Sequence, residues 1–301
     1  MQSFNQDISN NFLKDAEVSL TIKREDLLHP IVSGNKFRKL KYNLLEAKEL
    51  GKSCLLTFGG AYSNHILATA AAANQHGLKS IGVIRGEELK GNWFENPTLR
   101  QAKQFGMEFF FVNRDTYRLK DSESFLEKLN SKFGDFYLLP EGGTNNLAIK
   151  GCEEILERDD KAFDFVCTSV GTGGTMAGII NASHSHQYIL GFSALKGEFL
   201  KDSIANLTDA GNWKIIDDYH FGGYAKVDLK LIEFINSFKA EFNIPLDPIY
   251  TGKLFYGLFD LIKKGYFRSK SKILVIHTGG LQGISGMNTV LKKKNLPLLK
   301  I

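Results

Sequence analysis

Cationic side chains cluster around one turn near the N-terminus, in the segment Gly34-Asn35-Lys36-Phe37-Arg38-Lys39-Leu40. Glycine and asparagine tolerate turn conformations that β-branched residues avoid. Leucine and alanine then recur at positions 40, 44, 45 and 47, which predicts an amphipathic helix. An amine is therefore expected at the start of this helix, with further cations one turn later. A capped surface helix with solvated lysines is the alternative interpretation of this segment.

A glycine-rich segment, Gly171-Thr172-Gly173-Gly174-Thr175, follows the apolar run at residues 163–168. Glycines let backbone amides approach an anion without a Cβ clash, and threonines add hydroxyl groups. The segment lacks the Lys-Ser/Thr ending of a nucleotide P-loop and the full spacing of a dinucleotide fingerprint. It therefore predicts a site for a single phosphate. A tight turn that packs a helix on a sheet is the alternative.

Together, the two segments fit a phosphorylated aldehyde cofactor. Lys36 offers an amine for a Schiff base, and Lys39 could reach the phosphate. Asn64, which follows a strand and two glycines, could bond a ring hydroxyl, and a hydroxyl near the last strand could meet the ring nitrogen. A lysine, a phosphate cup and an electron-sink ring together predict pyridoxal 5'-phosphate.

Alternating strands and helices must position these groups. Strands are predicted at residues 18–23, 54–58, 80–84, 107–112, 136–139, 163–168, 188–192 and 273–276. Helices are predicted at residues 40–49, 66–76, 97–105, 122–133, 146–156, 176–182, 229–242 and 251–264. This alternation predicts an α/β fold with mostly parallel sheets. Residues 195–228 show no regular pattern.

Several motifs occur in the order seen in one family: residues 23–26 (KRED), 34–40 (GNKFRKL), 63–65 (SNH), 171–175 (GTGGT), 247–253 (DPIYTGK) and 277–280 (HTGG). The chain resembles the 1-aminocyclopropane-1-carboxylate deaminase and D-cysteine desulfhydrase family, pyridoxal-phosphate enzymes of the tryptophan-synthase-β fold, also called fold type II. The resemblance covers nearly the whole chain. It implies two domains, each an open twisted parallel sheet flanked by helices, with the cofactor in the cleft between them. The larger domain is expected to combine residues 1–40 with residues 145–301, and the smaller one to hold residues 41–144.

The resemblance also implies a role for each site residue. Lys36 resembles the Schiff-base lysine that also moves the substrate α-proton, and Asn64 the residue that bonds the cofactor ring oxygen. The phosphate cup corresponds to Lys39, Gly171, Thr172, Gly173, Gly174 and Thr175. The substrate side corresponds to Tyr62, Ser63, Asn64 and His65, with Tyr250 and, more loosely, Tyr224 as catalytic tyrosines. Thr251 takes the position facing the pyridine nitrogen, and Thr278 supplies the hydroxyl near the last strand.

Three of these residues have plainer interpretations. Ser63 could simply cap the following helix. Tyr224 lies in the least regular region and could be an ordinary core or surface tyrosine. For His65, a place in the first turn of a helix is favoured over a role as catalytic base.

Two departures from the family pattern bear on the substrate. Thr251 stands where the cyclopropane deaminases have glutamate, and the tetrad Gly60-Ala61-Tyr62-Ser63 differs from the usual residues before the serine. The favoured reaction is therefore β-elimination and deamination of D-cysteine or a similar amino acid, giving a 2-oxo acid, ammonia and sulfide. Ring opening of 1-aminocyclopropane-1-carboxylate is the first alternative. A non-catalytic protein that binds pyridoxal phosphate or phosphate is the second.

Composition narrows the class of protein. The 301 residues are 43% hydrophobic and 24% charged, with a net charge of +5, and the lysines are scattered rather than striped, so no nucleic-acid partner is predicted. The three cysteines fit neither a disulfide framework nor a zinc site, and His184-Ser185-His186 lacks further ligands, so no metal is predicted. No apolar stretch is long enough to span a membrane, and a cytoplasmic location is expected. A small amino-acid substrate and a homodimer complete the expectation.

Overall fold

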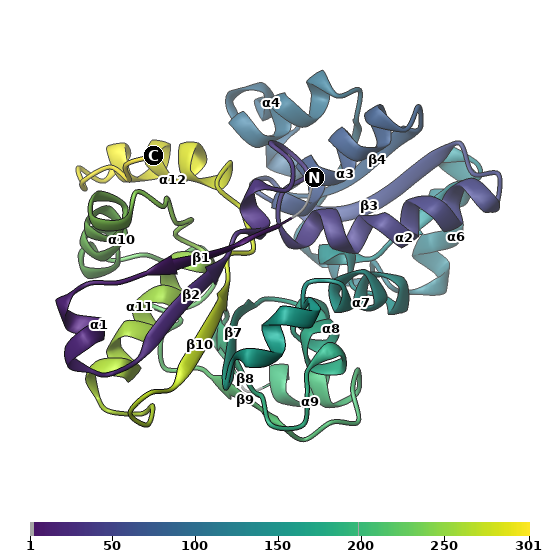
Figure 1. The fold of residues 1–301 in the computed structure, drawn as a ribbon. Coiled ribbons are helices and arrows are strands. Elements are labelled where there is room, and N and C mark those ends of the chain that lie inside the picture. Colours follow the sequence, from purple (N-terminus) through teal and green to yellow (C-terminus); the bar gives the residue numbers. More distant parts are fainter. Residues whose placement is uncertain (1–2, 198) are drawn as a thin grey trace.

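The computed structural model describes residues 3–197 and 199–301, and Figure 1 shows two sheets, each with helices on both faces. The larger sheet has the strand order β1-β2-β10-β7-β8-β9. Its members are β1 (Asn5–Ile8), β2 (Ser19–Lys23), β7 (Phe165–Val170), β8 (Tyr188–Ser193), β9 (Trp213–Ile216) and β10 (Lys272–Ile276). Only β1 pairs antiparallel.

The smaller sheet is wholly parallel, with the order β5-β4-β3-β6. Its strands are β3 (Cys54–Gly60), β4 (Lys79–Arg85), β5 (Glu108–Val112) and β6 (Tyr137–Leu139). The central strand β3 is buried from Cys54 to Gly59. Continuous apolar runs of this kind suit a parallel sheet, because helices cover both of its faces.

Twelve helices connect and cover the strands of the described chain (Figure 1). They are α1 (Asn11–Asp15), α2 (Asn35–Glu49), α3 (Asn64–Gln75), α4 (Pro97–Gln104), α5 (Arg114–Arg118), α6 (Glu123–Phe133), α7 (Asn146–Glu153), α8 (Gly174–Ala182), α9 (Phe199–Ala205), α10 (Leu229–Phe242), α11 (Thr251–Lys263) and α12 (Gly283–Lys293). Short 3₁₀ turns lie at Glu25–Leu27, Glu87–Leu89, Trp93–Glu95, Glu141–Gly143 and Arg158–Ala162. Several helices begin at a side chain that accepts a backbone N–H, namely Asn10, Ser63, Asn96, Asn113, Asn145 and Asp228.

Apolar side chains fill the space between each sheet and its helices. In the smaller sheet, Leu55 packs with α2 and α3, while Phe58 packs with α6 on the other face. In the larger sheet, β2, β7, β8 and β10 share one core with α10, α11 and α12. Helix α7 packs against both α2 and α8, so it joins the two halves of the molecule.

The predicted α/β class with mostly parallel sheets is confirmed. Residues 195–228, for which no regular element was predicted, contain α9 and β9, while β1, α1 and α5 were not predicted. Strand β1 is a polar four-residue edge strand, so it has too few buried positions for a pattern to show. The division into two domains at residues 40 and 145 stays a prediction. No helix in the described ranges is long and apolar enough to cross a membrane.

Candidate active site

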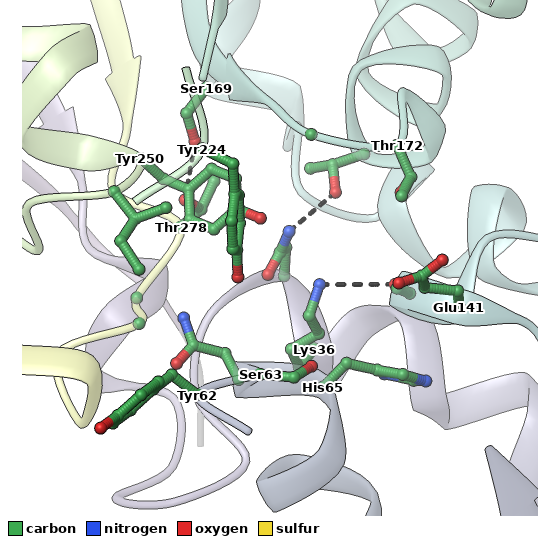
Figure 2. A pocket seen from close by; sticks show the side chains of 18 of the residues that line it. Lys36, Tyr62, Ser63, His65, Glu141, Ser169, Thr172, Tyr224, Tyr250 and Thr278 are labelled. Atoms are coloured by element: carbon green, nitrogen blue, oxygen red, sulfur yellow. Dashed lines mark hydrogen bonds between the residues drawn. The ribbon is translucent and has the colours of Figure 1, made fainter. Parts of the chain in front are cut away.

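The carboxyl ends of strands from both sheets converge on a cavity of about 460 Å³ (Figure 2). The loops after β3, β7 and β10 line it, together with the start of α2. In parallel α/β sheets, ligands bind outside the carboxyl ends of the strands. The cavity brings together most of the residues that the sequence marked as functional. Of these, Lys36, Lys39, Tyr62, Ser63, Asn64, His65, Gly171, Thr172, Gly173, Thr175, Tyr224, Tyr250 and Thr278 line it.

The first turn of α2 supplies two amines. This turn lies in close contact with the loop after β10: a Cβ at Gly34 would lie only 1.9 Å from the carbonyl oxygen of Thr278. Lys36 Nζ lies 3.4 Å from the Gly142 carbonyl oxygen. Lys39 Nζ lies 3.2 Å from the same oxygen and donates to Thr144 Oγ1 at 2.9 Å. One carbonyl therefore lies between two lysines, one turn of helix apart.

Neither lysine forms an ion pair with any carboxylate of residues 3–197 and 199–301. Burial, and then the charge of Lys39, lower the pKa of Lys36 to about 7. Burial also lowers the pKa of Lys39. A lysine that is half neutral near pH 7 can act as a nucleophile or base, whereas a buried ammonium without a counterion favours a bound anion.

The glycine loop after β7 lies beside Lys39 at the cavity, with Thr172 Oγ1 3.4 Å from Lys39 Nζ. Gly173 has a φ of 84°, a conformation that favours glycine, and α8 begins at the next residue. Thr175 Oγ1 accepts from Asn35 Nδ2 at 2.9 Å. Gly174 does not line the cavity, but a Cβ there would lie 3.3 Å from Lys39 Nζ and 2.7 Å from Thr144. A helix N-terminus, hydroxyl groups and an ammonium are the groups that bind phosphate.

The loop after β3 places Ser63, Asn64 and His65 at the start of α3. Ser63 caps this helix, since its Oγ accepts from Ile66 N at 3.3 Å, and it also lines the cavity. Asn64 Oδ1 is buried without a hydrogen-bond partner in the described chain, as a group that awaits a ligand would be. His65 is buried against Thr57 Oγ1 at 2.9 Å. Burial and the two nearby lysines keep the pKa of His65 well below its ordinary value, so its ring is neutral. His65 lies in the first turn of α3, as expected.

Three tyrosines border the cavity (Figure 2). The ring of Tyr62 covers Gly286 of α12, where a Cβ would lie 2.6 Å from it. Tyr224 is 41% exposed and stands edge-on to Tyr250, with 6.3 Å between the ring centroids. The irregular region therefore does deliver Tyr224 to the site.

Besides Gly174, Thr251 is a predicted site residue that does not line the cavity. Its side chain is fully buried and its hydroxyl donates to Asp247 Oδ1 at 2.7 Å. The Asp247 carboxylate also accepts the backbone N–H groups of Ile249, Tyr250 and Thr251, so it caps the start of α11 and draws the hydroxyl toward itself. The hydroxyls that do line the cavity at this side are Thr278 and Ser169, whose oxygens lie 3.1 Å apart.

Several residues that line the cavity were not among the predicted site residues, namely Ser33, Asn35, Arg85, Glu141, Ser169 and Gln282. Ser169 lies near the carboxyl end of β7, just before the glycine loop, and this placement was a usable signal. Arg85 is the last residue of β4, and Glu141 lies two residues past the end of β6. Their loops carry no distinctive spacing, so only the convergence of parallel strands could have indicated them.

Comparisons with known proteins agree with this chemistry. A family model described as "Pyridoxal-phosphate dependent enzyme" matches residues 8–279. The "Putative 1-aminocyclopropane-1-carboxylate deaminase" of Pyrococcus horikoshii is 33% identical over 293 residues, covering 91% of this chain and 88% of that protein. The mitochondrial "Bifunctional D-cysteine desulfhydrase/1-aminocyclopropane-1-carboxylate deaminase" of Arabidopsis thaliana is also 33% identical, over 294 residues, covering 88% of this chain and 73% of that protein.

Solved structures show the same likeness. A crystal structure of an "ACC deaminase homologue" superposes with a TM-score of 0.83 at 31% identity, covering 97% of this chain and 94% of that chain. The crystal structure of an O-ureido-L-serine synthase superposes with a TM-score of 0.70 at 13% identity, covering 94% of this chain and 90% of that chain. At so low an identity, the second likeness concerns the fold alone.

Proposed function

Since the chain belongs to the family of pyridoxal-phosphate dependent enzymes, we propose that it catalyses β-elimination from D-cysteine or a similar β-substituted amino acid. The products are a 2-oxo acid, ammonia and, from cysteine, sulfide. Membership of the 1-aminocyclopropane-1-carboxylate deaminase and D-cysteine desulfhydrase family follows from the relatives. The choice between the two reactions is the proposal.

Pyridoxal 5'-phosphate is the cofactor of this family, and the cavity fits it. Lys39, the glycine loop and the start of α8 would hold the phosphate, because a buried ammonium without an ion pair faces a helix N-terminus there. Asn64, with its unpartnered buried oxygen, would hold the ring hydroxyl. When bound, the cofactor supplies an electron sink for the charge left on the substrate α-carbon.

The side chains of this protein divide the remaining work. Lys36 Nζ, with a pKa of about 7, accepts the proton of the substrate α-carbon and holds it near neutral pH. Ser63 and the backbone N–H groups at the start of α3 bind the substrate carboxylate, since an anion is favoured at a helix N-terminus. Tyr224 and Tyr250, edge-on to each other at the cavity, are placed to give a proton to the departing group.

The observation that favours β-elimination is the uncharged wall formed by Ser169 and Thr278. We place the pyridine nitrogen at this wall. Of the described lining residues, only Glu141 is acidic; its carboxylate accepts from Tyr117 Oη at 2.8 Å and lies away from this wall (Figure 2). A carboxylate beside the nitrogen would hold a proton on it, whereas a hydroxyl offers no charge to do so. A less strongly activated ring suffices where the α-proton is removable and a thiolate leaves readily.

Ring opening of 1-aminocyclopropane-1-carboxylate is the second candidate. It is favoured by the names of the relatives, one of which is described as carrying both activities. The substrate of that reaction has no α-proton, so it depends more on the electron sink. The uncharged wall formed by Ser169 and Thr278 therefore disfavours ring opening.

The deciding experiment measures both reactions on the purified, cofactor-loaded protein. Sulfide and pyruvate are assayed with D-cysteine and L-cysteine, pyruvate with 3-chloro-D-alanine, and 2-oxobutanoate with 1-aminocyclopropane-1-carboxylate. We expect turnover of the D-amino acids and little or no ring opening. Efficient ring opening with D-cysteine inert would overturn the proposal, and a yellow protein that turns over none of these substrates would favour a binding protein. Sedimentation of the same sample would test the homodimer that we propose with it; a cytoplasmic location is likewise a proposal.

A further inference from the structure

The segment that carries Tyr224 into the cavity has an unusual backbone. Phe221, Gly222, Gly223 and Ala225 have φ angles of 53°, 91°, 111° and 55°. Positive φ costs a residue with a Cβ about 1 kcal/mol or more. Two of the four carry such a side chain, so this segment needs contacts that hold it in place. Without them, Tyr224 would have no fixed position relative to the site.

Lys253 of α11 supplies those contacts. Its side chain is 1% exposed, and Nζ donates to the carbonyl oxygens of His220 at 2.8 Å and Gly223 at 2.7 Å. A third carbonyl, that of Ala194, lies 3.5 Å away. An ammonium has three N–H donors, so backbone carbonyls take all of them. The Gly223 carbonyl belongs to the residue directly before Tyr224, and the His220 carbonyl belongs to the residue four positions before it.

No interaction other than these carbonyl contacts accounts for the Lys253 amine in the described chain. It forms no ion pair within the described chain, and burial lowers its pKa to about 8. Keeping a cation in such a place is unfavourable unless every donor is satisfied. An apolar side chain of similar length would pack without this cost, so the amine is explained by the carbonyls that it binds.

The helix that carries Lys253 also places Tyr250. Tyr250 is the residue directly before α11, and Lys253 lies in its first turn. The helix has little freedom to shift, since a Cβ at Gly252 would lie 2.6 Å from Ile235 and 2.8 Å from the Asp247 carbonyl. The N-terminal end of α11 therefore fixes the position of Tyr250 directly and the position of Tyr224 through Lys253.

We propose that Lys253 is a positioning residue: its ammonium fixes residues 220–225 and so holds the Tyr224 hydroxyl beside Tyr250 at the cavity. This deepens the proposed function and rests on it, because the two phenols are the groups that protonate the departing group. Burial raises the pKa of Tyr224 and, more strongly, that of Tyr250, while the hydrogen bond between them opposes the rise at Tyr224 and adds to it at Tyr250. Changing the distance between the rings therefore changes how readily Tyr224 gives up its proton.

The test is a double-mutant cycle on the cofactor-loaded enzyme. Lys253→Met removes the ammonium at similar volume, Tyr224→Phe removes the hydroxyl, and Lys264→Met, on an exposed side chain just past the same helix, is the matched control. Loss of a positioned proton donor lowers rates by about 100-fold or more. Because both variants keep Tyr250, we expect each of the first two to lower kcat by about 10- to 100-fold with KM changed less than threefold. In the Tyr224→Phe background, Lys253→Met should cost less than about threefold more. Multiplicative losses would show that Lys253 acts independently of Tyr224 and would overturn the proposal.

Amide hydrogen exchange gives a second readout that needs no turnover. In Lys253→Met, amides of residues 221–226 should exchange at least about tenfold faster while those of β7 and β10 stay unchanged. Exchange that is unaltered in this segment, or raised throughout the molecule, would contradict the proposal. If the unmodified enzyme eliminates no substrate, the proposed function fails while this measurement still decides the role of Lys253.

A second variant covers the case in which Lys253→Met does not fold. In Gly223→Ala, the new Cβ meets nothing closer than 3.6 Å, but the backbone is strained at this φ, so the Gly223 carbonyl should shift relative to Lys253. The same fall in kcat, lost in the Tyr224→Phe background, is expected. A Gly223→Ala enzyme with unchanged kcat and unchanged exchange at residues 221–226 would count against the proposal.

Discussion

Removing the Lys36 amine should abolish a pH dependence of the free energy of unfolding in the cofactor-free protein. In the folded chain, burial and then the charge of Lys39 lower the pKa of Lys36 from 10.5 to about 7. The unfolded chain therefore binds more protons than the folded chain at pH values between these two, approaching one proton in the middle of the range. Stability rises with pH wherever the unfolded state binds more protons. The cofactor-free protein should thus gain stability from Lys36 between about pH 7 and pH 10.5, and this gain should be absent in Lys36→Met.

The magnitude follows from the same two pKa values. Fully developed, the slope is about 1.4 kcal/mol per pH unit. From pH 7, where Lys36 is half protonated in the folded state, to pH 9, the gain integrates to about 2 kcal/mol. Lys36 lines a cavity that solvent enters, and screening reduces the effect, so about 1 kcal/mol is the expected difference. Lys39 and Lys253 also have lowered pKa values, but they are present in both proteins and their contributions cancel in the comparison.

The assay is denaturant unfolding of the cofactor-free protein at pH 7, 8 and 9, after removal of the cofactor with an aldehyde-trapping amine. Lys41→Met is the matched control, because Lys41 lies on the same helix and its hydrogen bond with Glu154 raises its pKa, so it does not titrate in this range. Wild type and Lys41→Met should gain stability with pH in parallel, and Lys36→Met should gain about 1 kcal/mol less. Identical slopes in all three proteins would refute the assignment of a lowered pKa to Lys36.

Three further predictions address the cofactor site. Borohydride reduction followed by peptide mapping should find the cofactor attached to Lys36 alone; label on another lysine would show that the roles are misassigned. Gly173→Asp should lower cofactor occupancy severely, because a Cβ at Gly173 would lie 2.9 Å from Ile204 of α9 and would displace the glycine loop. Gly106→Asp, at a similar φ of 86° in open space, should leave occupancy unchanged; equal occupancy in both variants would make the loop a simple turn. Thr278→Val should shift the absorbance of the bound cofactor. Thr251→Val should leave it unshifted and lower stability by about 2 kcal/mol through the lost hydrogen bond to the Asp247 carboxylate; the reverse pattern would place Thr251 at the ring.

Much of the site could be predicted because it lies on loops that share one topological position. Lys36, Ser63 and the Gly171–Thr175 loop are far apart in sequence, yet the last two each follow a parallel strand. The carboxyl ends of parallel strands meet at one edge, so residue types directly after strands carried the signal. Lys36 precedes its strand instead, and its place depends on the close approach of Gly34 to Thr278, which no local pattern reveals.

Other contacts depend on positions that sequence spacing does not encode. Tyr224 reaches the cavity on a segment with positive φ angles, which hydrogen bonds from a lysine 29 residues later in the chain contact. A region predicted to be irregular can lie anywhere in the fold, so the sequence did not indicate the position of Tyr224. Thr251 follows Tyr250 in a motif, so a place beside the ring was a natural expectation. The competing interaction is local: the buried Asp247 carboxylate needs donors, and the Thr251 hydroxyl belongs to the same residue as one of the backbone N–H groups that supply them.

This competition between Asp247 and the cavity decides what a glutamate at position 251 would do. In the present arrangement, a second carboxylate at this place would face Asp247, whose pKa burial already raises. Two buried carboxylates in contact cannot both ionise, so the pair would hold a proton. To act on the ring instead, the new side chain would have to turn toward the Ser169–Thr278 wall, away from the start of α11. We therefore expect Thr251→Glu alone to lower both stability and β-elimination without producing ring opening, and Asp247→Asn/Thr251→Glu to recover part of the lost stability. A single Thr251→Glu variant that opens 1-aminocyclopropane-1-carboxylate efficiently, at unchanged stability, would show that the side chain reaches the ring without opposition from Asp247.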